Sequence, residues 1–434
     1  GCASHTVYKE NYFSFTPSQT ATYDFSTCGT SWDTRLAVLS SCSTAATAVL
    51  QCSDDSCGYQ AALSVRLTAG TTYRVLVGGF GTSDAGPGTL SVATQSSGTG
   101  ADVIVGDLVG ISNYAAVTVG GVSVGAYAIG TTSCNIGTAQ LEWFASPNNR
   151  HPFIPQNMYR FKGGRLEQIG MGWGKHGFTA LQGTVCGTCT ASSSGSYLGI
   201  GCSDPYSSGL NGSQSGLGCR SEVNASTGVF PGTINAGMPT AATSIHRRIQ
   251  VPRPALDPAL NAGAVYLAEG HYIAQDDAAA GNDDNNCSWR IFSVGTLNSN
   301  GAYNLAFPAS STTQRQQPAI NAWKTFDPSV RLANVDVPGD GRFAVAHSVK
   351  DNGNGTWRYE YAIQNLNSDR SGGSFSVPVP AGATITNIGF KAPAYMNGEG
   401  YSSTPWTVST ADGAVTWTCE PNTNANANAL RWST

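Results

Sequence analysis

Apolar and polar residues alternate in short runs through the first hundred residues, and Gly, Ser and Asp separate the runs. An alternation with a period of two is typical of antiparallel strands that bury one face. The apolar side chains of residues 63–67 share one face, as do those of residues 73–77, and Ala69-Gly70 lies between them. We therefore predict a hairpin over these residues that is packed on one side.

The longer remainder of the chain, residues 102–434, continues this pattern and has few stretches periodic enough for a helix. Pro318 to Phe326 is the best helical segment. A turn or two of helix is also expected around Ala139 to Ala145. Most of this part is therefore expected to be strand.

Two alternating segments late in the chain, 343–349 and 357–363, flank a turn rich in Gly and Asn. They predict a hairpin with an aromatic face, and its Trp357 and Tyr359 are expected to point toward the core. A further strand at 375–379 carries a proline, which lacks a donor and indicates a sheet edge. An immunoglobulin-like sandwich fits this last part, near residues 335–434.

The length of 434 residues exceeds one ordinary core and indicates two domains. The stretch from Gln95 to Gly100 has nothing to bury and is typical of a flexible Gly/Ser linker. We predict a mostly β fold. It consists of a small N-terminal β-sandwich over residues 1–95, a linker over 96–101 and a larger β-rich domain over 102–434.

The chain is poor in charge, with 12% charged residues, 52 Gly and a net charge of -4. Lys and Arg number 23 against 27 Asp and Glu, which leaves no excess of positive charge to attract nucleic acid or anionic lipid. No apolar run approaches the roughly 20 residues of a membrane helix. We therefore expect neither nucleic-acid binding nor a membrane span.

Twelve cysteines without a strong zinc spacing indicate an oxidising compartment, so we expect an extracellular or cell-surface protein with disulfide bonds. Five lie before the predicted linker and seven after it. If all are oxidised, at least one bridge joins the two domains or two chains, and Cys2 is the preferred participant. An unpaired thiol is the alternative.

Cys186 and Cys189 form a C-x-x-C pair, which is also the spacing of redox and zinc sites. No predicted helix or α/β context surrounds the pair, and Cys202 and Cys219 follow in the same Gly/Ser-rich region. Local disulfide bonds are therefore favoured.

The first domain resembles the bacterial pre-peptidase C-terminal domain, a small β-sandwich often attached to secreted enzymes and surface proteins. Such domains are accessory modules, some of which bind calcium or polysaccharide, so the resemblance implies attachment or stabilisation. It covers roughly residues 12–94 and rests on four segments: Phe25–Gly29, Trp32–Leu36, Cys52–Asp55 and Leu67–Tyr73.

The second domain resembles a group of predicted secreted bacterial proteins to which we assign no activity. The resemblance spans most of residues 102–432. It rests on Gly130–Gly137, His151–Arg160, Gly170–Phe178, Cys202–Tyr206 and Tyr359–Arg370.

Calcium is the cofactor that the sequence supports best, because this hard cation takes several oxygen ligands from turns rich in Asp and Asn. The first candidate site is Asp33, Asp54 and Asp55, which match acidic positions of the resembled domain. The second candidate site is a cluster flanked by glycine: Asp276, Asp277, Asn282, Asp283 and Asp284. Neither set follows an EF-hand loop, and the alternative interpretation is that both are solvated acidic turns.

Two of the six histidines, His151 and His176, lie in an aromatic stretch that also contains Glu167. These three residues are candidates for a catalytic or transition-metal site. No H-x-H or H-E-x-x-H spacing places two ligands together. The favoured interpretation is that the histidines are structural and bond to the backbone.

The segment Gly121-Val122-Ser123-Val124-Gly125 fits the G-x-S-x-G pattern of a nucleophilic serine. That chemistry needs a strand-to-helix turn. A β-like run follows the segment instead, so a serine nucleophile is not favoured.

Exposed aromatic side chains on β surfaces can stack on sugar rings, and the chain has 9 Trp and 17 Tyr. Most of them are expected to be core residues. Trp32, which lies beside a turn, and Trp406 are the two expected to serve as ligand-binding platforms.

These observations favour a secreted or cell-surface binding or structural protein. It would bind polysaccharide, act as an adhesin, or self-assemble through strand edges or an intermolecular disulfide into an extracellular appendage or coat. The alternative is an extracellular hydrolase or metal-dependent enzyme with its site in residues 102–434. A metal assay discriminates between the two classes.

Overall fold

The chain forms two compact units, residues 1–97 and 98–434. The division falls within the predicted linker, although residues 95–98 and Cys2 lie outside the residues that the structure describes. The computed structural model describes residues 7–18, 21–41, 48–56, 59–94, 99–213, 216–232, 243–393, 396, 399, 402, 404–421 and 428–434.

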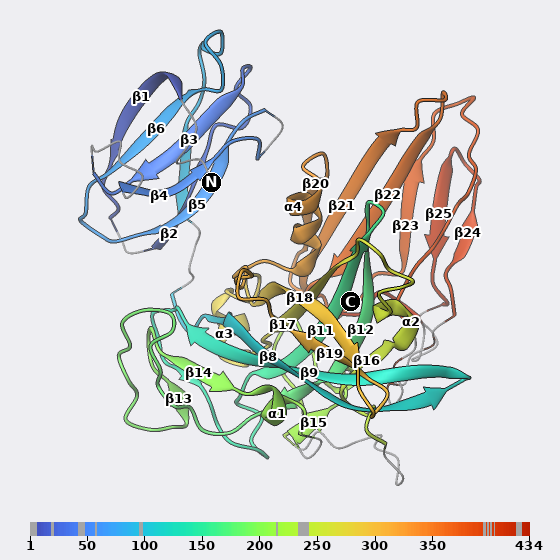
Figure 1. Ribbon diagram of the computed structural model, residues 1–434. Coiled ribbons are helices and arrows are strands. Elements are labelled where there is room, and N and C mark those ends of the chain that lie inside the picture. Colours follow the sequence, from blue (N-terminus) through green and yellow to red (C-terminus); the bar gives the residue numbers. More distant parts are fainter. Residues whose placement is uncertain are drawn as a thin grey trace. The chain divides into compact units, whose positions relative to one another are not determined.

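The first unit is a sandwich of two antiparallel sheets (Figure 1). One sheet has the order β1-β6-β3-β4 and the other β5-β2-β7. Their apolar faces share one core, in which Phe25, Leu36 and Val75 are fully buried. The strands are β1 (Tyr8–Phe15), β2 (Ala21–Ser26), β3 (Thr34–Leu39), β4 (Val49–Ser53), β5 (Ala62–Leu67), β6 (Tyr73–Gly79) and β7 (Ser91–Thr94).

The hairpin predicted over residues 63–77 is wrong. Both strands exist, but β5 pairs with β2 whereas β6 pairs with β1 and β3, so the segment between them crosses from one sheet to the other. Leu63, Leu67 and Val75 all belong to one core. Two apolar strand faces can meet across a sandwich as well as side by side in a sheet, and here they meet across it.

The second unit is built on a ten-stranded antiparallel sheet. Its path is β14-β9-β16-β12-β11-β17-β18-β19, with β8 on β9 and β15 on β12. Its strands are β8 (Val103–Val119), β9 (Val122–Asn135), β11 (Phe153–Lys162), β12 (Arg165–His176), β14 (Ser203–Tyr206), β15 (Leu217–Gly218), β16 (Ile249–Pro252), β17 (Val265–His271), β18 (Cys287–Leu297) and β19 (Tyr303–Ala306). The mostly β class predicted for the chain is confirmed.

The longest strands, β8 and β9, form a hairpin whose turn explains the G-x-S-x-G segment. Gly120 and Gly121 occupy the turn with φ of 54° and 81°, which glycine adopts without strain. Ser123 lies opposite Thr118 in the ladder that follows. The serine is therefore a strand residue beside a hairpin turn, and the sharp turn into a helix that a nucleophile needs is absent.

Helices are short in the part of the chain that the structure describes. The predicted segment Pro318–Phe326 is a 3₁₀ turn, Ala319–Asn321, followed by α4 (Ala322–Phe326). The helix expected at residues 139–145 is wrong, because β10 (Leu141–Glu142) pairs there with β13 (Tyr197–Leu198) and buries Leu141 and Trp143. The other α-helices are α1 (Ser208–Asn211), α2 (Arg253–Leu256) and α3 (Gln275–Ala280).

The last part of the chain has two three-stranded antiparallel sheets, β20-β21-β22 and β23-β25-β24 (Figure 1). The predicted hairpin is β21 with β22, and the proline-bearing strand β23 is at a sheet edge as expected. The rings of Tyr361 and Phe375 join the two sheets at 5.4 Å. The strands are β20 (Arg331–Val337), β21 (Gly341–Asp351), β22 (Trp357–Asn365), β23 (Ser374–Pro378), β24 (Thr407–Ser409) and β25 (Ala414–Thr418).

The prediction that the aromatic face of this hairpin is buried is wrong. Trp357 and Tyr359 are each 57% exposed, whereas Ala344 and Ala346 on the opposite face are buried against Trp323 of α4. The small side chains let the helical segment approach the sheet closely. The large rings therefore lie on the side away from that core.

A buried polar network joins the central sheet to β22 and to residues near 433. The Glu269 carboxylate on β17 accepts hydrogen bonds from Asn157 Nδ2 and Tyr159 Oη, both at 2.8 Å, and from Gln364 Nε2 at 2.9 Å. Asn157 Nδ2 also donates to the Ser433 carbonyl oxygen at 3.0 Å. The network therefore links three segments that are far apart in sequence.

Arg220 occupies the same buried layer. Its guanidinium donates to the carbonyl oxygens of Gly172, Gln156 and Ser433 and to Asn157 Oδ1, at 2.6–2.9 Å. A buried charge is tolerated when such bonds replace its hydration. Arg220 consequently fixes the base of the pocket described below.

Candidate functional sites

Asp33, Asp54 and Asp55 come together at one end of the first unit. Asp33 directly precedes β3, while Asp54 and Asp55 directly follow β4. Because β3 and β4 are antiparallel neighbours, the start of one strand and the end of the other meet at the same edge. One carboxylate oxygen from each residue lies within 4.8 Å of the other two.

The charges in this cluster suit a hard cation. Partial burial raises the pKa of Asp33, and the neighbouring Asp55, Asp54 and Asp84 carboxylates raise it further. Arg35 offsets part of the negative charge, with its Nε 3.1 Å from Asp54 Oδ2. Asp33 Oδ1 and Asp54 Oδ1 are buried without a hydrogen-bond partner. Three carboxylates in one cluster, two of them with a buried oxygen that has no partner, match the ligands that calcium prefers.

The second predicted calcium site is not assembled, because its carboxylates bond to different segments. Asp276 Oδ2 accepts from the Glu142 amide, and Asp277 Oδ1 accepts from the Val103 amide. Asp283 accepts from Asn367 Nδ2, while Asp284 pairs with Arg342 at 3.0 Å. Within the described residues, the one group of three possible metal ligands that lie close together is the Asp33 cluster. These four aspartates therefore hold loops in place through hydrogen bonds and an ion pair.

The structure brings His151 and His176 together, as the catalytic hypothesis required, but places Glu167 elsewhere. His151 Nδ1 lies 2.6 Å from the Pro152 carbonyl oxygen, and His176 bonds to the carbonyl oxygens of Asn148 and Gly177. Glu167 instead pairs with Arg160 at 2.8 Å. Both histidines are buried. The interpretation of structural histidines bonded to the backbone agrees with this geometry.

Trp32 is held in place rather than presented as a platform. Its indole Nε1 donates to the Pro87 carbonyl oxygen at 3.2 Å, and Gly86 lies directly against the ring. The side chain is half-buried. We therefore assign it no ligand.

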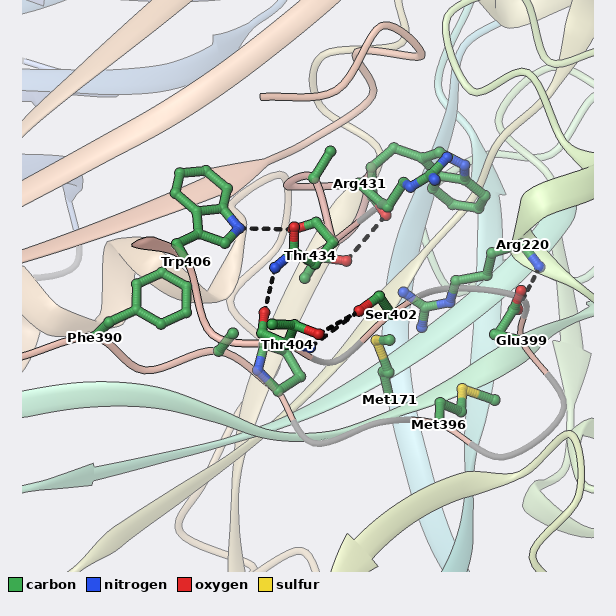
Figure 2. A pocket seen from close by; sticks show the side chains of 15 residues that line it. Met171, Arg220, Phe390, Met396, Glu399, Ser402, Thr404, Trp406, Arg431 and Thr434 are labelled. Atoms are coloured by element: carbon green, nitrogen blue, oxygen red, sulfur yellow. Dashed lines mark hydrogen bonds between the residues drawn. The ribbon is translucent and has the colours of Figure 1, made fainter. Parts of the chain in front are cut away.

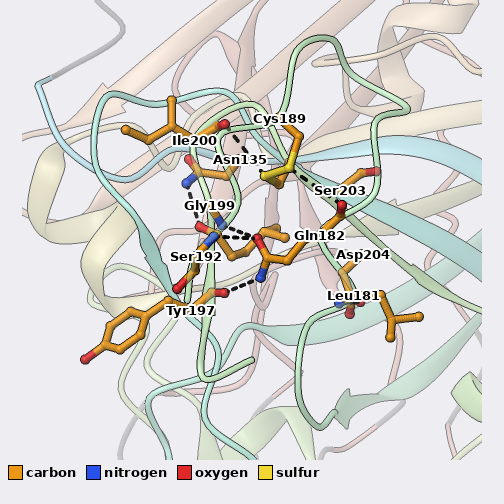
Figure 3. Close-up of a disulfide and its surroundings, with 12 residues drawn as sticks. Asn135, Leu181, Gln182, Cys189, Ser192, Tyr197, Gly199, Ile200, Ser203 and Asp204 are labelled. Carbon is orange, nitrogen blue, oxygen red and sulfur yellow. Dashed lines mark hydrogen bonds between the residues drawn. A yellow bond between two sulfur atoms is a disulfide. The ribbon is translucent and has the colours of Figure 1, made fainter. Parts of the chain in front are cut away.

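Disulfide bonds staple the Gly/Ser-rich loop that follows β12. Cys134 pairs with Cys186, and Cys189 pairs with Cys202. Figure 3 shows Gln182 beside the second bridge, where its Oε1 accepts from the amides of Ser192 and Gly199. The two cysteines of the C-x-x-C pair thus bond to separate partners and not to each other. The Cys189–Cys202 bridge confirms the local disulfide predicted here, whereas Cys186 bonds to a residue of β9 that is 52 positions away.

Trp406, the other predicted platform, lines a pocket in the second unit (Figure 2). Its ring stacks on Phe390, with centroids 5.6 Å apart and planes inclined by 20°. The indole Nε1 donates to the Asn428 carbonyl oxygen at 2.7 Å, which fixes the ring. Phe390 is 36% exposed, so an aromatic surface faces solvent at the rim.

Polar groups line the rest of this pocket, whose volume is ≈ 80 Å³. Ser402 and Thr404 share a hydroxyl hydrogen bond, and Arg220 and Glu399 lie at the opposite side from the aromatic pair (Figure 2). Burial raises the pKa of Glu399, whose Oε1 accepts from the Arg220 amide at 2.8 Å. The cavity holds a few waters or one ligand substituent, so a larger ligand would rest on the aromatic rim.

Sequence reasoning missed every residue of this pocket except Trp406. Its lining spans residues 171–434, and no local spacing connects Met171 or Arg220 to Phe390.

No family model, curated protein or solved structure matches the chain. No helix among the described residues is both long and apolar enough to cross a membrane.

Proposed function

We propose that this protein is a secreted or cell-surface binding protein whose second unit recognises carbohydrate at the Phe390–Trp406 pocket. The observation that carries the proposal is the combination of a stacked, partly exposed aromatic pair with hydroxyl, amide and charged groups in one pocket. Sugar rings present apolar C–H faces to aromatic rings and hydroxyls to polar groups. A concave site with a few polar groups beside aromatic side chains suits that recognition.

Calcium is proposed to support the first unit as an accessory module, held by Asp33, Asp54 and Asp55. Two of these carboxylates have a buried oxygen without a partner. A cation bound to these oxygens would offset the burial and the repulsion between carboxylates that together raise the pKa of Asp33. The disulfide bonds of the second unit are compatible with an oxidising, extracellular setting.

Binding to a panel of purified neutral and acidic polysaccharides, followed by calorimetry on the best ligand, tests the main proposal. Trp406→Ala and Phe390→Ala should each weaken binding at least tenfold. Trp357→Ala is the matched control, because that ring is also exposed but lies outside the pocket. Absence of binding across the panel, or an equal loss in the control, would contradict the proposal.

Self-association is a second candidate property, and one edge strand favours it. Seven residues of β20 form the edge of the β20-β21-β22 sheet, and five of them are exposed, including Val335 at 49%. An open strand edge offers unpaired backbone groups to a second chain. Val335→Lys should abolish any oligomer seen by size-exclusion chromatography. A monomeric wild type at high concentration would remove this candidate.

The enzyme alternative has less support in the second unit. The set that motivated it, His151, His176 and Glu167, is not assembled, and both imidazoles are covered. A His176→Ala variant with unchanged polysaccharide binding and no change in hydrolysis of the ligand would count against it.

A further inference from the structure

The turn between β21 and β22 has the sequence Asn352-Gly353-Asn354-Gly355, and no role has been assigned to it. Every residue from 351 to 359 is exposed. Gly353 and Gly355 adopt φ of 72° and 82°, and a β carbon added at either position would meet nothing within 4 Å. The turn is therefore open to water on the outside of the second unit.

An asparagine that precedes glycine can convert itself to aspartate. The backbone nitrogen of the glycine attacks the side-chain carbonyl carbon Cγ, and the missing β carbon of glycine leaves room for this approach. A bond between this nitrogen and Cγ forms, the Cγ–Nδ2 bond breaks, and ammonia leaves with the proton of the glycine N–H. Water then opens the five-membered imide to aspartate or isoaspartate, with no change in oxidation state. The reaction therefore needs a free glycine N–H and a polarised asparagine carbonyl.

Gly355 supplies the free N–H. Four Asn-Gly pairs lie within the described residues, and in three of them the glycine N–H already donates a hydrogen bond. These glycines and their acceptors are Gly212 with the Ser208 carbonyl oxygen, Gly301 with the Asn298 carbonyl oxygen, and Gly353 with Asp351 Oδ1, at 2.8–3.0 Å. In the part of the chain that the structure describes, the Gly355 N–H has no acceptor. Its nitrogen is therefore the available one of the four.

Thr356 polarises the carbonyl group of Asn354. Its amide and its hydroxyl both donate to Asn354 Oδ1, at 3.1 Å and 2.6 Å. Two donors at this oxygen stabilise the negative charge that develops on it during the attack. Asn211 differs, because it is 3% exposed and its Nδ2 is held by the Ile129 carbonyl oxygen and by Thr131. Both requirements are thus met at Asn354, and neither is met at Asn211.

We propose that Asn354 is a self-modification site, at which the folded protein releases ammonia and becomes an aspartate or isoaspartate form. The product adds one negative charge to a chain whose net charge is -4, so ion exchange separates the two forms. The new carboxylate lies in the turn that leads to the exposed ring of Trp357. No turn residue lines the Phe390–Trp406 pocket, so this proposal and the carbohydrate proposal can fail separately.

The test is incubation of the folded full chain at mildly alkaline pH, followed by pepsin digestion in acid and peptide mass spectrometry. Modification at Asn354 should be at least tenfold faster than at Asn211 or Asn300. In urea, which removes the turn, the three positions should react at similar rates. Thr356→Val keeps the side-chain shape without the hydroxyl and should slow the folded reaction at least threefold. Thr407→Val is the matched control, because this threonine is also exposed but lies on β24.

Each contrary result contradicts a stated step. An intact Asn354 in the folded chain, with modification in urea, would overturn the proposal. Equal rates at Asn211, Asn300 and Asn354 in the folded chain would show that the turn does not select the site and would also overturn it. Faster modification at Asn352 would place the site on the neighbouring pair. An unchanged rate in Thr356→Val, shown to be folded by circular dichroism and thermal melting, would overturn the part assigned to the hydroxyl.

Discussion

The imidazole rings of His151 and His176 stack in the second unit with their centroids 4.9 Å apart and their planes inclined by 24°. Burial lowers the pKa of His151 to about 3, and the neighbouring His176 and Lys175 lower it further. Burial also lowers the pKa of His176. Two protonated rings in this stack would repel each other, so the folded protein holds the pair neutral.

Acid should therefore weaken this unit. Because the folded pKa values lie below the unfolded value of about 6.5, the unfolded chain binds more protons. The stability that His151 contributes is complete above pH 6.5 and decreases as the pH falls toward 3. Between pH 6.5 and 5 we expect a loss of about 1–2 kcal/mol from His151, and His176 acts in the same direction.

Urea unfolding of the wild type and of a His151→Gln/His176→Gln variant at both pH values measures this effect. The difference between the two proteins is the proper readout, since burial raises the pKa of Asp204 and Asp283 to about 6 and these groups oppose the trend. The free energy of unfolding of the wild type, relative to that of the variant, should decrease from pH 6.5 to pH 5. A constant difference would contradict the prediction.

Glu269→Gln should destabilise the second unit strongly. The carboxylate accepts from Asn157, Tyr159, Gln364 and the Ala319 amide, whereas a glutamine would turn its own N–H₂ toward these donors. Breaking one partner of a buried charged network costs about 3–5 kcal/mol. Urea unfolding measures the loss. Glu142→Gln, which removes a surface pair with Arg150, should cost about 1 kcal/mol or less.

The two disulfide bonds should contribute unequally to stability. Cys134 and Cys186 are separated by 52 residues, and Cys189 and Cys202 by 13. On the chain-entropy model, alanine at both ends of the longer bridge costs about 4 kcal/mol, and at both ends of the shorter one about 3 kcal/mol. Differential scanning calorimetry tests the order of the two variants, and a reversed order would contradict the model.

Gly106→Ala should mimic loss of the longer bridge. A β carbon at this position would collide with the sulfur atoms of both Cys134 and Cys186. Thiol titration should then detect two additional sulfhydryls in the variant. Gly120→Ala serves as a control, since a β carbon there meets open space and the cost is confined to backbone strain.

Calcium should bind the first unit with a measurable pH dependence. Burial and the neighbouring carboxylates raise the pKa of Asp33, so protons compete with the cation there, and affinity should fall as acid protonates this group. Calorimetry with calcium chloride should show one site in the full chain, lost in Asp33→Asn. Asp24→Asn, on β2 of the same unit and outside the cluster, should bind normally. Calcium binding that persists in Asp33→Asn would contradict the assignment of the site to this cluster.

Cys419 should be the most reactive of the described thiols. Cys287 is fully buried, whereas Cys419 is partly exposed. Burial raises the pKa of Cys419, so labelling with a maleimide should accelerate above pH 9. Cys419→Ser should remove the fast phase and any disulfide-linked dimer on a non-reducing gel. Fast labelling of Cys287 in the folded protein would contradict the structure.

Local patterns predicted the strands well. The Asp33 cluster is predicted from the resemblance of the first unit to a known domain, and the structure brings its three carboxylates together because they flank two paired strands. The density of aspartates at 276–284 also predicts a calcium site. The structure does not assemble that site, because each side chain bonds to a different segment. Periodicity also showed that β22 has two faces, but it could not show which one α4 would cover. Trp357 is exposed because Ala344 and Ala346 admit the helical segment.

The pocket was beyond sequence reasoning for a different reason. Trp406 was singled out from its isolation in the pattern, yet its partner Phe390 and the base formed by Arg220 depend on how β12 meets the end of the chain. Arg220 can be buried because its guanidinium donates to backbone carbonyl oxygens, and no spacing of residues in the sequence predicts such a position.

The hydrogen bond between Asn157 and the Ser433 carbonyl oxygen spans 276 residues. A ribosome that adds about 5–20 residues per second needs roughly 15–55 s to make that interval. During that time the polar layer around Asn157 lacks its final acceptor, and the nascent second unit presents an incompletely covered sheet to chaperones and proteases.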